Sequence, residues 1–397
     1  MKNVLLAAAS FLMIIVFSGS AIEPACEFSS PLAFAGNPLT LQKDKTVHKE
    51  FKVQSGKLLN LDFNTGASIN VEGWDKDIVS VDAELGGRDW EDISLDFNQT
   101  SGGVDITTEY DNHRNHRSSK VDFTIKVPEK FNLKFTTMGG DVKLNKLEGE
   151  LNGTTMGGSL TLTNLKGFVS LKTMGGPISL TDSDVDGKVS TMGGKVKIEN
   201  VTGNVDGKSM GGNVTIKNLK RRDGSGVGKE VHISTMGGDI DLNTAPYGAN
   251  VNTMGGDITI NSVEKYVKAK TMGGKILLRS VNGSIKATTM GGDIEVTETG
   301  TGDNKDIELK SLSGDITLVL PAGFSMDIIA KITYNKDDSG KYKIHSDFNL
   351  NETKETKNGG WSNDDNETLK GTGSFNGGKN TVTISTIVGD IYIKKAK

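Results

Sequence analysis

The sequence predicts an all-β fold, a parallel β-solenoid (β-helix) of two-strand coils of about 18 residues, with β-rich caps at both ends. The tetrapeptide Thr-Met-Gly-Gly, once with Ser in place of Thr, recurs at a constant step, as from Met138 to Met156 to Met174, with one longer step. After each copy, apolar and polar residues alternate, as on a strand with one buried face. A short fixed period is typical of repeat architectures, in which each unit stacks on its neighbours.

Nine of the 12 methionines occupy one slot of this repeat. The residues four and six positions after each Met are always Val, Leu or Ile, such as Ile258 and Ile260. A second strand precedes each Thr, and the parity of that strand points the Thr hydroxyl inward. The nine repeat methionines are Met138, Met156, Met174, Met192, Met210, Met236, Met254, Met272 and Met290.

The start of the chain predicts export. Lys2 precedes an apolar run over residues 4–17, followed by small residues, so we expect a signal peptide over residues 1–21 and a linker over 22–46. No later stretch is apolar enough to span a bilayer, so no transmembrane segment is expected. The single cysteine, Cys26, lacks the preceding residues of a lipoprotein motif, and a lipid anchor there is not expected.

Residues 47–130 are predicted to form an N-terminal β cap of entry strands. Residues 64–71 read as a degenerate repeat, and Trp74 and Trp90 suit a cap that covers an open strand edge. A loop over residues 111–117 carries two histidines, but no third ligand is identifiable, so no metal site is predicted there.

The regular array is predicted over residues 131–318 and contains one insertion. The step from Met210 to Met236 is longer than the regular step, such as that from Met192 to Met210. The extra residues begin with the basic trio Lys220, Arg221 and Arg222, a candidate contact for an anionic glycan or lipid head group. A tolerated surface loop is the commoner explanation of such an insertion.

The methionine column allows two interpretations. Strand parity places Met opposite the inward Thr and favours exposure, whereas the Gly-Gly bend can turn Met back toward the core. Because soluble proteins rarely expose a long apolar strip, partial burial as corner filler is favoured. An exposed column would be a candidate contact surface for a hydrophobic partner. An ice-binding role of the Thr column is disfavoured, because these hydroxyls are expected to point inward.

Asp239 and Asp257 follow Met at the same slot in neighbouring coils. They could chelate Ca²⁺ or serve as the carboxylate pair of a glycoside hydrolase. Lys275 occupies the same slot in the next coil and interrupts this acidic row, and the sequence has no long loop here that could form the wall of a cleft around the aspartates. A solvated charged row is therefore the preferred interpretation, and neither a cofactor nor a metal is predicted.

The remaining features limit the partners. The net charge of −4 and the pI near 5.9, without a basic cluster large enough for a polyanion, predict no nucleic-acid partner. Residues 319–397 are predicted to form a C-terminal β cap with a long polar loop, closed by a final degenerate repeat at residues 386–393.

The repeated pattern Val-x-x-x-Thr-x-Gly-Gly-Asp-Ile-x-Leu, an early Val127-Pro128, a late Leu320-Pro321 and a final Gly-Asp-Ile strand resemble a bacterial β-strand-repeat family of proposed adhesins. This family is a domain of unknown function found in exported β-solenoids, and the resemblance covers about residues 45–397. It implies a cell-envelope or surface role and offers no catalytic residues to carry over.

The preferred hypothesis is a non-enzymatic exported protein of the cell envelope or surface, an adhesin or scaffold that presents a rigid β-solenoid. Its partner is an unidentified surface, glycan or protein. Two alternatives stay open. A polysaccharide-active β-helix enzyme rests on fold analogy alone. An envelope sensor would bind a peptide or lipid along the methionine column.

Overall fold

The fold is known from a computed structural model, which describes residues 45–111, 119–220, 230–357 and 366–397. Across these ranges it has 32 β-strands, two short 3-10 turns (Trp90–Asp92 and Lys336–Asp338) and no α-helix, which confirms the predicted fold class. No helix within these ranges is long and apolar enough to cross a membrane. The predicted signal peptide, Cys26, the two loop histidines, Arg221 and Arg222 lie outside the described residues.

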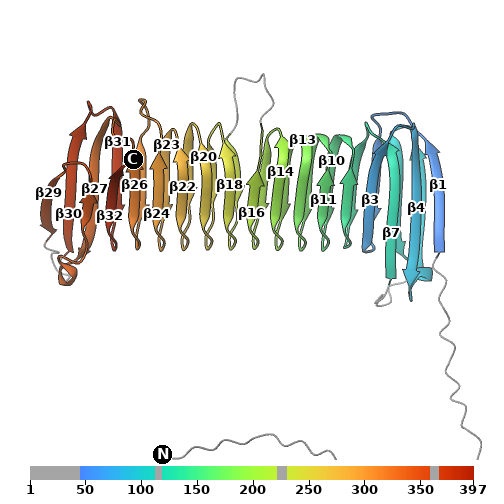
Figure 1. Cartoon of the computed structure of the whole chain (residues 1–397). Helices are drawn as coiled ribbons and strands as arrows, with labels where there is room; N and C mark the ends of the chain where they lie inside the picture. The colour runs from blue at the N-terminus through green and yellow to red at the C-terminus, as the bar shows by residue number, and fades with distance from the viewer. Residues whose placement is uncertain (1–44, 112–118, 221–229, 358–365) are drawn as a thin grey trace, which may run out of the picture. The chain divides into compact units, whose positions relative to one another are not determined.

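The coil strands form two parallel stacks (Figure 1). The pre-Met stack holds the strands that lead into each Thr. Its members are β8 (Asn132–Thr137), β10 (Glu148–Thr155), β12 (Lys166–Thr173), the second half of β13 (Ile178–Thr191), β15 (Val205–Ser209), β17 (Val231–Ser234), β19 (Ala249–Asn252), β21 (Tyr266–Lys270), β23 (Ser284–Thr289), β25 (Ile307–Ser311) and β31 (Asn380–Thr386).

The post-Met stack holds the strands that follow each Gly-Gly. Its members are β9 (Val142–Asn145), β11 (Leu160–Thr163), the first half of β13, β14 (Val196–Thr202), β16 (Val214–Lys217), β18 (Ile240–Ala245), β20 (Ile258–Val263), β22 (Ile276–Val281), β24 (Ile294–Glu298), β26 (Ile316–Leu320) and β32 (Ile391–Lys395).

Equivalent columns lie over one another in both stacks. Ile258 pairs with Ile240 on one side and with Ile276 on the other. Every residue of the two aliphatic columns after Met is buried, so the core is a narrow aliphatic layer between the stacks. Strand alternation and register were thus predictable from the sequence, because each column is apolar throughout.

Antiparallel strands close both ends. At the N-terminal end, β1 pairs with β4, β4 with β7, and β5 with β6, while β2 and β3 join this layer to the first coil. Ile69 and Val71 of β3 pair with Val142 and Leu144, which confirms the degenerate repeat. These strands are β1 (Lys45–Lys52), β2 (Leu58–Phe63), β3 (Ala67–Trp74), β4 (Ile78–Gly87), β5 (Ile93–Thr100), β6 (Gly103–Tyr110) and β7 (Ser119–Pro128).

At the C-terminal end, β31 and β32 form the last coil after an excursion through β27 (Met326–Asn335), β28 (Ile344–Ser346), β29 (Asn351–Lys357) and β30 (Asn366–Phe375). β27 lies between β31 and β30, and β29 forms the edge beyond β30. The edge strands β1 and β29 read KTVHKEFK and NETKETK. Charged edges of this kind oppose pairing with a further chain.

The bend after the post-Met strand changes along the array. In the first five coils it holds one non-glycine residue with positive φ, and Asn is the commonest type there. The Asn218 amide donates to Asn200 Oδ1 at 2.9 Å, and the Asn200 amide donates to Asp182 Oδ1 at 2.9 Å. Asn tolerates the left-handed conformation better than most residues, which accounts for this column. The glycines three residues later in these coils, such as Gly167 and Gly203, also have positive φ. The Asn column was not predicted from the sequence.

Candidate functional site

The Thr-Met-Gly-Gly bend is held by a ladder of buried hydroxyl groups. The Thr253 hydroxyl donates to the carbonyl of Gly238 in the preceding coil at 2.9 Å. It also accepts the N–H of Gly256 in its own coil at 3.3 Å. The same pair of bonds recurs at Thr155, Thr173, Thr191, Ser209, Thr235, Thr271 and Thr289. The predicted inward orientation of this column is confirmed, since all its members are buried.

The second glycine of each bend is fixed by close packing between coils. A Cβ atom on Gly256 would lie 2.1 Å from the carbonyl oxygen of Gly238. The first glycine has more room, because a Cβ atom on Gly255 would lie 3.5 Å from the nearest atom, the carbonyl oxygen of Gly237. The second glycine therefore has no space for any side chain.

The methionine between the anchored Thr and Gly-Gly points outward. Eight of the nine methionines expose between 38% and 55% of their surface, and Met174 is intermediate. The expectation that the column serves as corner filler was wrong. The Thr hydroxyl uses the inner side of the bend, so the next side chain has only the outer side available.

The exposed column continues beyond the last methionine. Leu312 and Ile387 occupy the same slot in the last two coils and are 48% and 44% exposed. Backbone bonds join the slot from coil to coil, since Met254 N–H donates to Met236 O at 3.2 Å and Met272 N–H to Met254 O at 3.1 Å. We call these nine methionines with Leu312 and Ile387 the methionine ridge.

The acidic row beside the ridge joins neighbouring coils. Asp239 Oδ1 accepts the N–H of Asp257 at 2.9 Å, and Asp257 Oδ1 accepts the N–H of Lys275 at 2.7 Å. Asp141 does the same for Ser159, and the backbone and hydroxyl bonds from Ser159 lower the pKa of that carboxyl. One oxygen of each aspartate is thus used in stacking. Among the described residues, no three His, Cys, Asp or Glu side chains gather into a group that could hold a metal ion.

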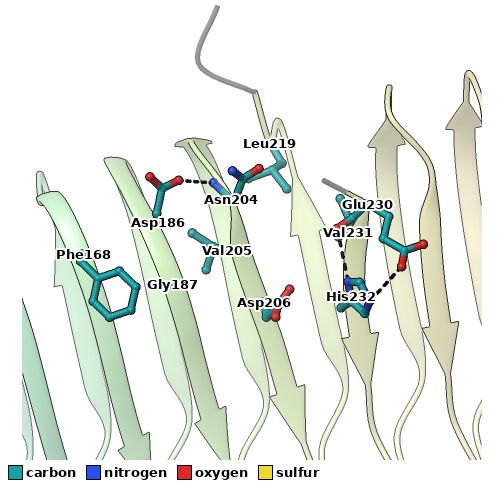
Figure 2. Close-up of a pocket in the computed structure, with 10 residues that line it drawn as sticks. All are labelled: Phe168, Asp186, Gly187, Asn204, Val205, Asp206, Leu219, Glu230, Val231 and His232. Carbon is teal, nitrogen blue, oxygen red and sulfur yellow. Dashed lines mark hydrogen bonds and ion pairs between the residues drawn. The ribbon is translucent and has the colours of Figure 1, made fainter. Parts of the chain in front are cut away.

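A shallow groove of about 590 Å³ lies on the outer face of the pre-Met stack (Figure 2). Phe168, 45% exposed, lies at one end, and Asp206 and His232 lie on the strands beyond it. His232 Nε2 is 3.0 Å from Glu230 Oε1, and Asp186 Oδ1 accepts the N–H of Asn204 at 2.7 Å. The sequence did not indicate this groove, because its residues come from four coils. Of the predicted basic trio, only Lys220 is described, and it is exposed.

A buried ion pair lies near the end of the array. The Glu298 side chain is fully buried, and its Oε1 lies 3.8 Å from Lys305 Nζ. Glu298 Oε1 also accepts the N–H of Gly300 at 2.8 Å, and Lys305 Nζ contacts the side-chain oxygen of Asn282. Burial raises the pKa of Glu298 to about 7. The backbone hydrogen bonds and the Lys305 charge act in the opposite direction and lower this pKa, but burial has the larger effect.

We expect Glu298 to make the protein less stable as the pH rises. Its folded-state pKa of about 7 exceeds the ordinary 4.5, so between these values the folded chain holds more protons than the unfolded chain. Stability from this group is complete below pH 4.5 and is lost as the pH rises through 7. Urea unfolding of the wild type and of Glu298→Gln at several pH values tests this. In the variant, the free energy of unfolding should fall less steeply with pH over this range. Equal pH dependence in the two proteins would contradict a raised pKa at Glu298.

Comparisons with known proteins identify relatives of the fold. A model of the Toastrack DUF4097 family matches residues 58–261 and, in an overlapping second match, residues 229–394. The comparison with curated proteins gave no match.

Seven chains of solved structures are similar, and three of them illustrate the range. A proposed cell adhesion protein from Clostridium sporogenes is 11% identical with a TM-score of 0.20, over 89% of this chain and 100% of that chain. A proposed adhesin from Parabacteroides merdae is 13% identical with a TM-score of 0.25, over 61% and 96%. A proposed lipid-binding protein from Parabacteroides distasonis is 11% identical with a TM-score of 0.22, over 89% and 97%. Similarity at this level says nothing about function.

Proposed function

Because the chain belongs to the Toastrack DUF4097 family and its coils share one exposed apolar ridge, we propose that it is an exported, non-enzymatic adhesin or scaffold of the cell envelope or cell surface. The methionine ridge is the contact surface in this proposal, and its partner presents an apolar protein or lipid surface. Export rests on the predicted signal peptide over residues 1–21.

The observation that carries the proposal is the continuity of the ridge. Exposed apolar side chains that are scattered singly need no explanation, whereas a contiguous apolar strip marks an interaction site. Here the same slot stays apolar in successive coils, including the two coils without the repeat methionine. Unbranched methionine adapts to partners of different shape, which suits a contact surface.

The enzymatic alternative has weaker support. The aspartates that would form a carboxylate pair each use one oxygen to bind the next coil. Polymer hydrolysis or elimination by the purified chain, abolished by Asp239→Asn, would overturn the non-enzymatic assignment.

Protease treatment of intact cells tests the location. If the chain is displayed outward, the protease cleaves it while a periplasmic control protein stays intact. Protection until the outer layer is breached would contradict surface adhesion and leave the role of an internal scaffold.

Polar substitution of the ridge tests the contact surface. The triple variant Met236→Ser, Met254→Ser and Met272→Ser should reduce retention of the purified chain on an octyl-coated surface by about tenfold, because each lost contact contributes roughly 0.5 kcal/mol or more. The matched control is Phe168→Ser with Leu58→Ser, which removes comparably exposed apolar side chains away from the ridge. Equal losses in the two variants would argue for general hydrophobicity and against the ridge.

A second candidate function is glycan binding in the groove. Exposed Phe168 offers a flat apolar face for a pyranose ring, and Asn204 and Asp206 offer polar groups two coils further along the groove. Binding sites commonly combine an aromatic platform with a few polar groups. Titration with envelope polysaccharides should show binding that Phe168→Ala abolishes and that the triple Ser variant of the ridge retains. Binding that survives Phe168→Ala would exclude this groove.

A further inference from the structure

The methionine column is more uniform than its packing requires. The two buried aliphatic columns interchange Val, Leu and Ile freely among the nine coils, whereas the methionine column holds Met in all nine. The uniformity of the Thr column is explained by its hydroxyl ladder, and that of the second glycine by the close approach of the neighbouring coil. Neither explanation applies to the exposed methionine side chains. Leu312 and Ile387 show that the slot accepts other apolar residues.

What methionine adds to an apolar side chain is its thioether. Thioethers are soft ligands that select soft ions such as Cu⁺ over the hard cations that carboxylates bind. An isolated exposed methionine is a weak ligand, but parallel stacking repeats the thioether in neighbouring coils.

The spacing of the coils suits an ion between two sulfur atoms. Neighbouring strands of a stack lie about 4.8 Å apart. Metal–sulfur bonds of about 2.3 Å, the length at zinc–thiolate sites, place two sulfur atoms about 4.6 Å apart in linear coordination. The backbone bonds from Met254 to Met236 and from Met272 to Met254 bring the methionine slots of successive coils together.

We propose that the methionine ridge is a linear binding site for soft monovalent metal ions, Cu⁺ or Ag⁺, each held between the thioethers of neighbouring coils. The segment from Met236 to Met290 is the best placed part. Asp239, Asp257 and Asp293 lie in the adjacent row, and their exposed carboxylates attract cations. Lys275 is the one positive side chain in that part of the row, and it pairs with Glu295.

This inference does not depend on the contact function proposed above. Leucine keeps a side chain apolar but removes the sulfur, whereas serine removes both properties. Leucine variants should therefore lose metal and keep adhesion to an apolar surface. Failure of one proposal can thus be distinguished from failure of the other.

The test uses Ag⁺, which needs no reductant, and the full chain carrying Cys26→Ser, so that the single thiol cannot bind the ion. We expect about four to eight Ag⁺ per chain by equilibrium dialysis against free methionine, according to whether neighbouring ions share thioethers. Adding Met236→Leu, Met254→Leu and Met272→Leu removes four of the eight neighbouring methionine pairs of the ridge. Bound Ag⁺ should then fall by about half.

The matched control is Met326→Leu in the same Cys26→Ser chain, because Met326 is fully buried and lies outside the ridge. It should leave the bound Ag⁺ unchanged. A triple Leu variant that binds as much Ag⁺ as its parent, or a parent that retains none against free methionine, would overturn the proposal. Circular dichroism of each variant checks the fold, and X-ray absorption of the bound ion should show sulfur neighbours.

Discussion

Replacing Gly256 with Ala is expected to lower the free energy of unfolding by about 3 kcal/mol or more. The new methyl group would lie 2.1 Å from the carbonyl oxygen of Gly238, a backbone atom that no rotamer change can move. Relief would require the two coils to separate, and that would stretch the Thr253 hydroxyl bond across the same junction. Urea unfolding followed by circular dichroism measures the loss.

Gly255→Ala is the matched control, because it adds the same methyl group one residue earlier in the same bend. Its nearest atom would be 3.5 Å away, and Gly255 is exposed. We expect a change within about 0.5 kcal/mol, as at other surface positions. If both variants lose the same stability, the cause is the loss of glycine flexibility in general, and the close-packing argument fails.

Much of the fold could be predicted because columns of the repeat carry the same physical demand in every coil. Val, Leu and Ile at two alternating slots fix both the strand and its buried face. The inward Thr followed from parity alone. Parity also favoured an exposed Met, but Met lies where the strand ends and the bend begins, so parity alone could not decide its orientation. Only the Thr hydroxyl bonds in three dimensions show that the inner side of the bend is already occupied.

The missed features depend on contacts between coils. Asp239 reads in the sequence as a solvated carboxylate, yet its oxygen binds the backbone of the next coil. The groove gathers Phe168 and His232 from strands that lie several coils apart in the sequence, which no local pattern indicates. Nothing in the local sequence marks Glu298 as buried, because its partners Gly300 and Lys305 lie in the irregular segment that follows the strand.

Replacing Thr253 with Val is expected to cost about 3 kcal/mol of unfolding free energy, although the two side chains have nearly the same shape. Valine cannot donate to Gly238 O or accept from Gly256 N–H, so both backbone groups lose this partner in a buried bend. A polar group left without a partner in a protein interior costs roughly 1–3 kcal/mol. The loss should appear as a lower urea midpoint, with the Met254 side chain still exposed.

Thr253→Ser separates the hydroxyl from the methyl group. Serine already occupies this slot at Ser209, where its hydroxyl donates to Gly194 O at 2.7 Å and accepts Gly212 N–H at 2.9 Å. The serine variant should therefore retain most of the stability that valine loses. If serine destabilises the protein as much as valine does, then packing of the threonine methyl group, and not the hydroxyl ladder, joins the coils at this bend. The exposure of the ridge would then need another cause, because the ladder is what reserves the inner side of the bend for Thr.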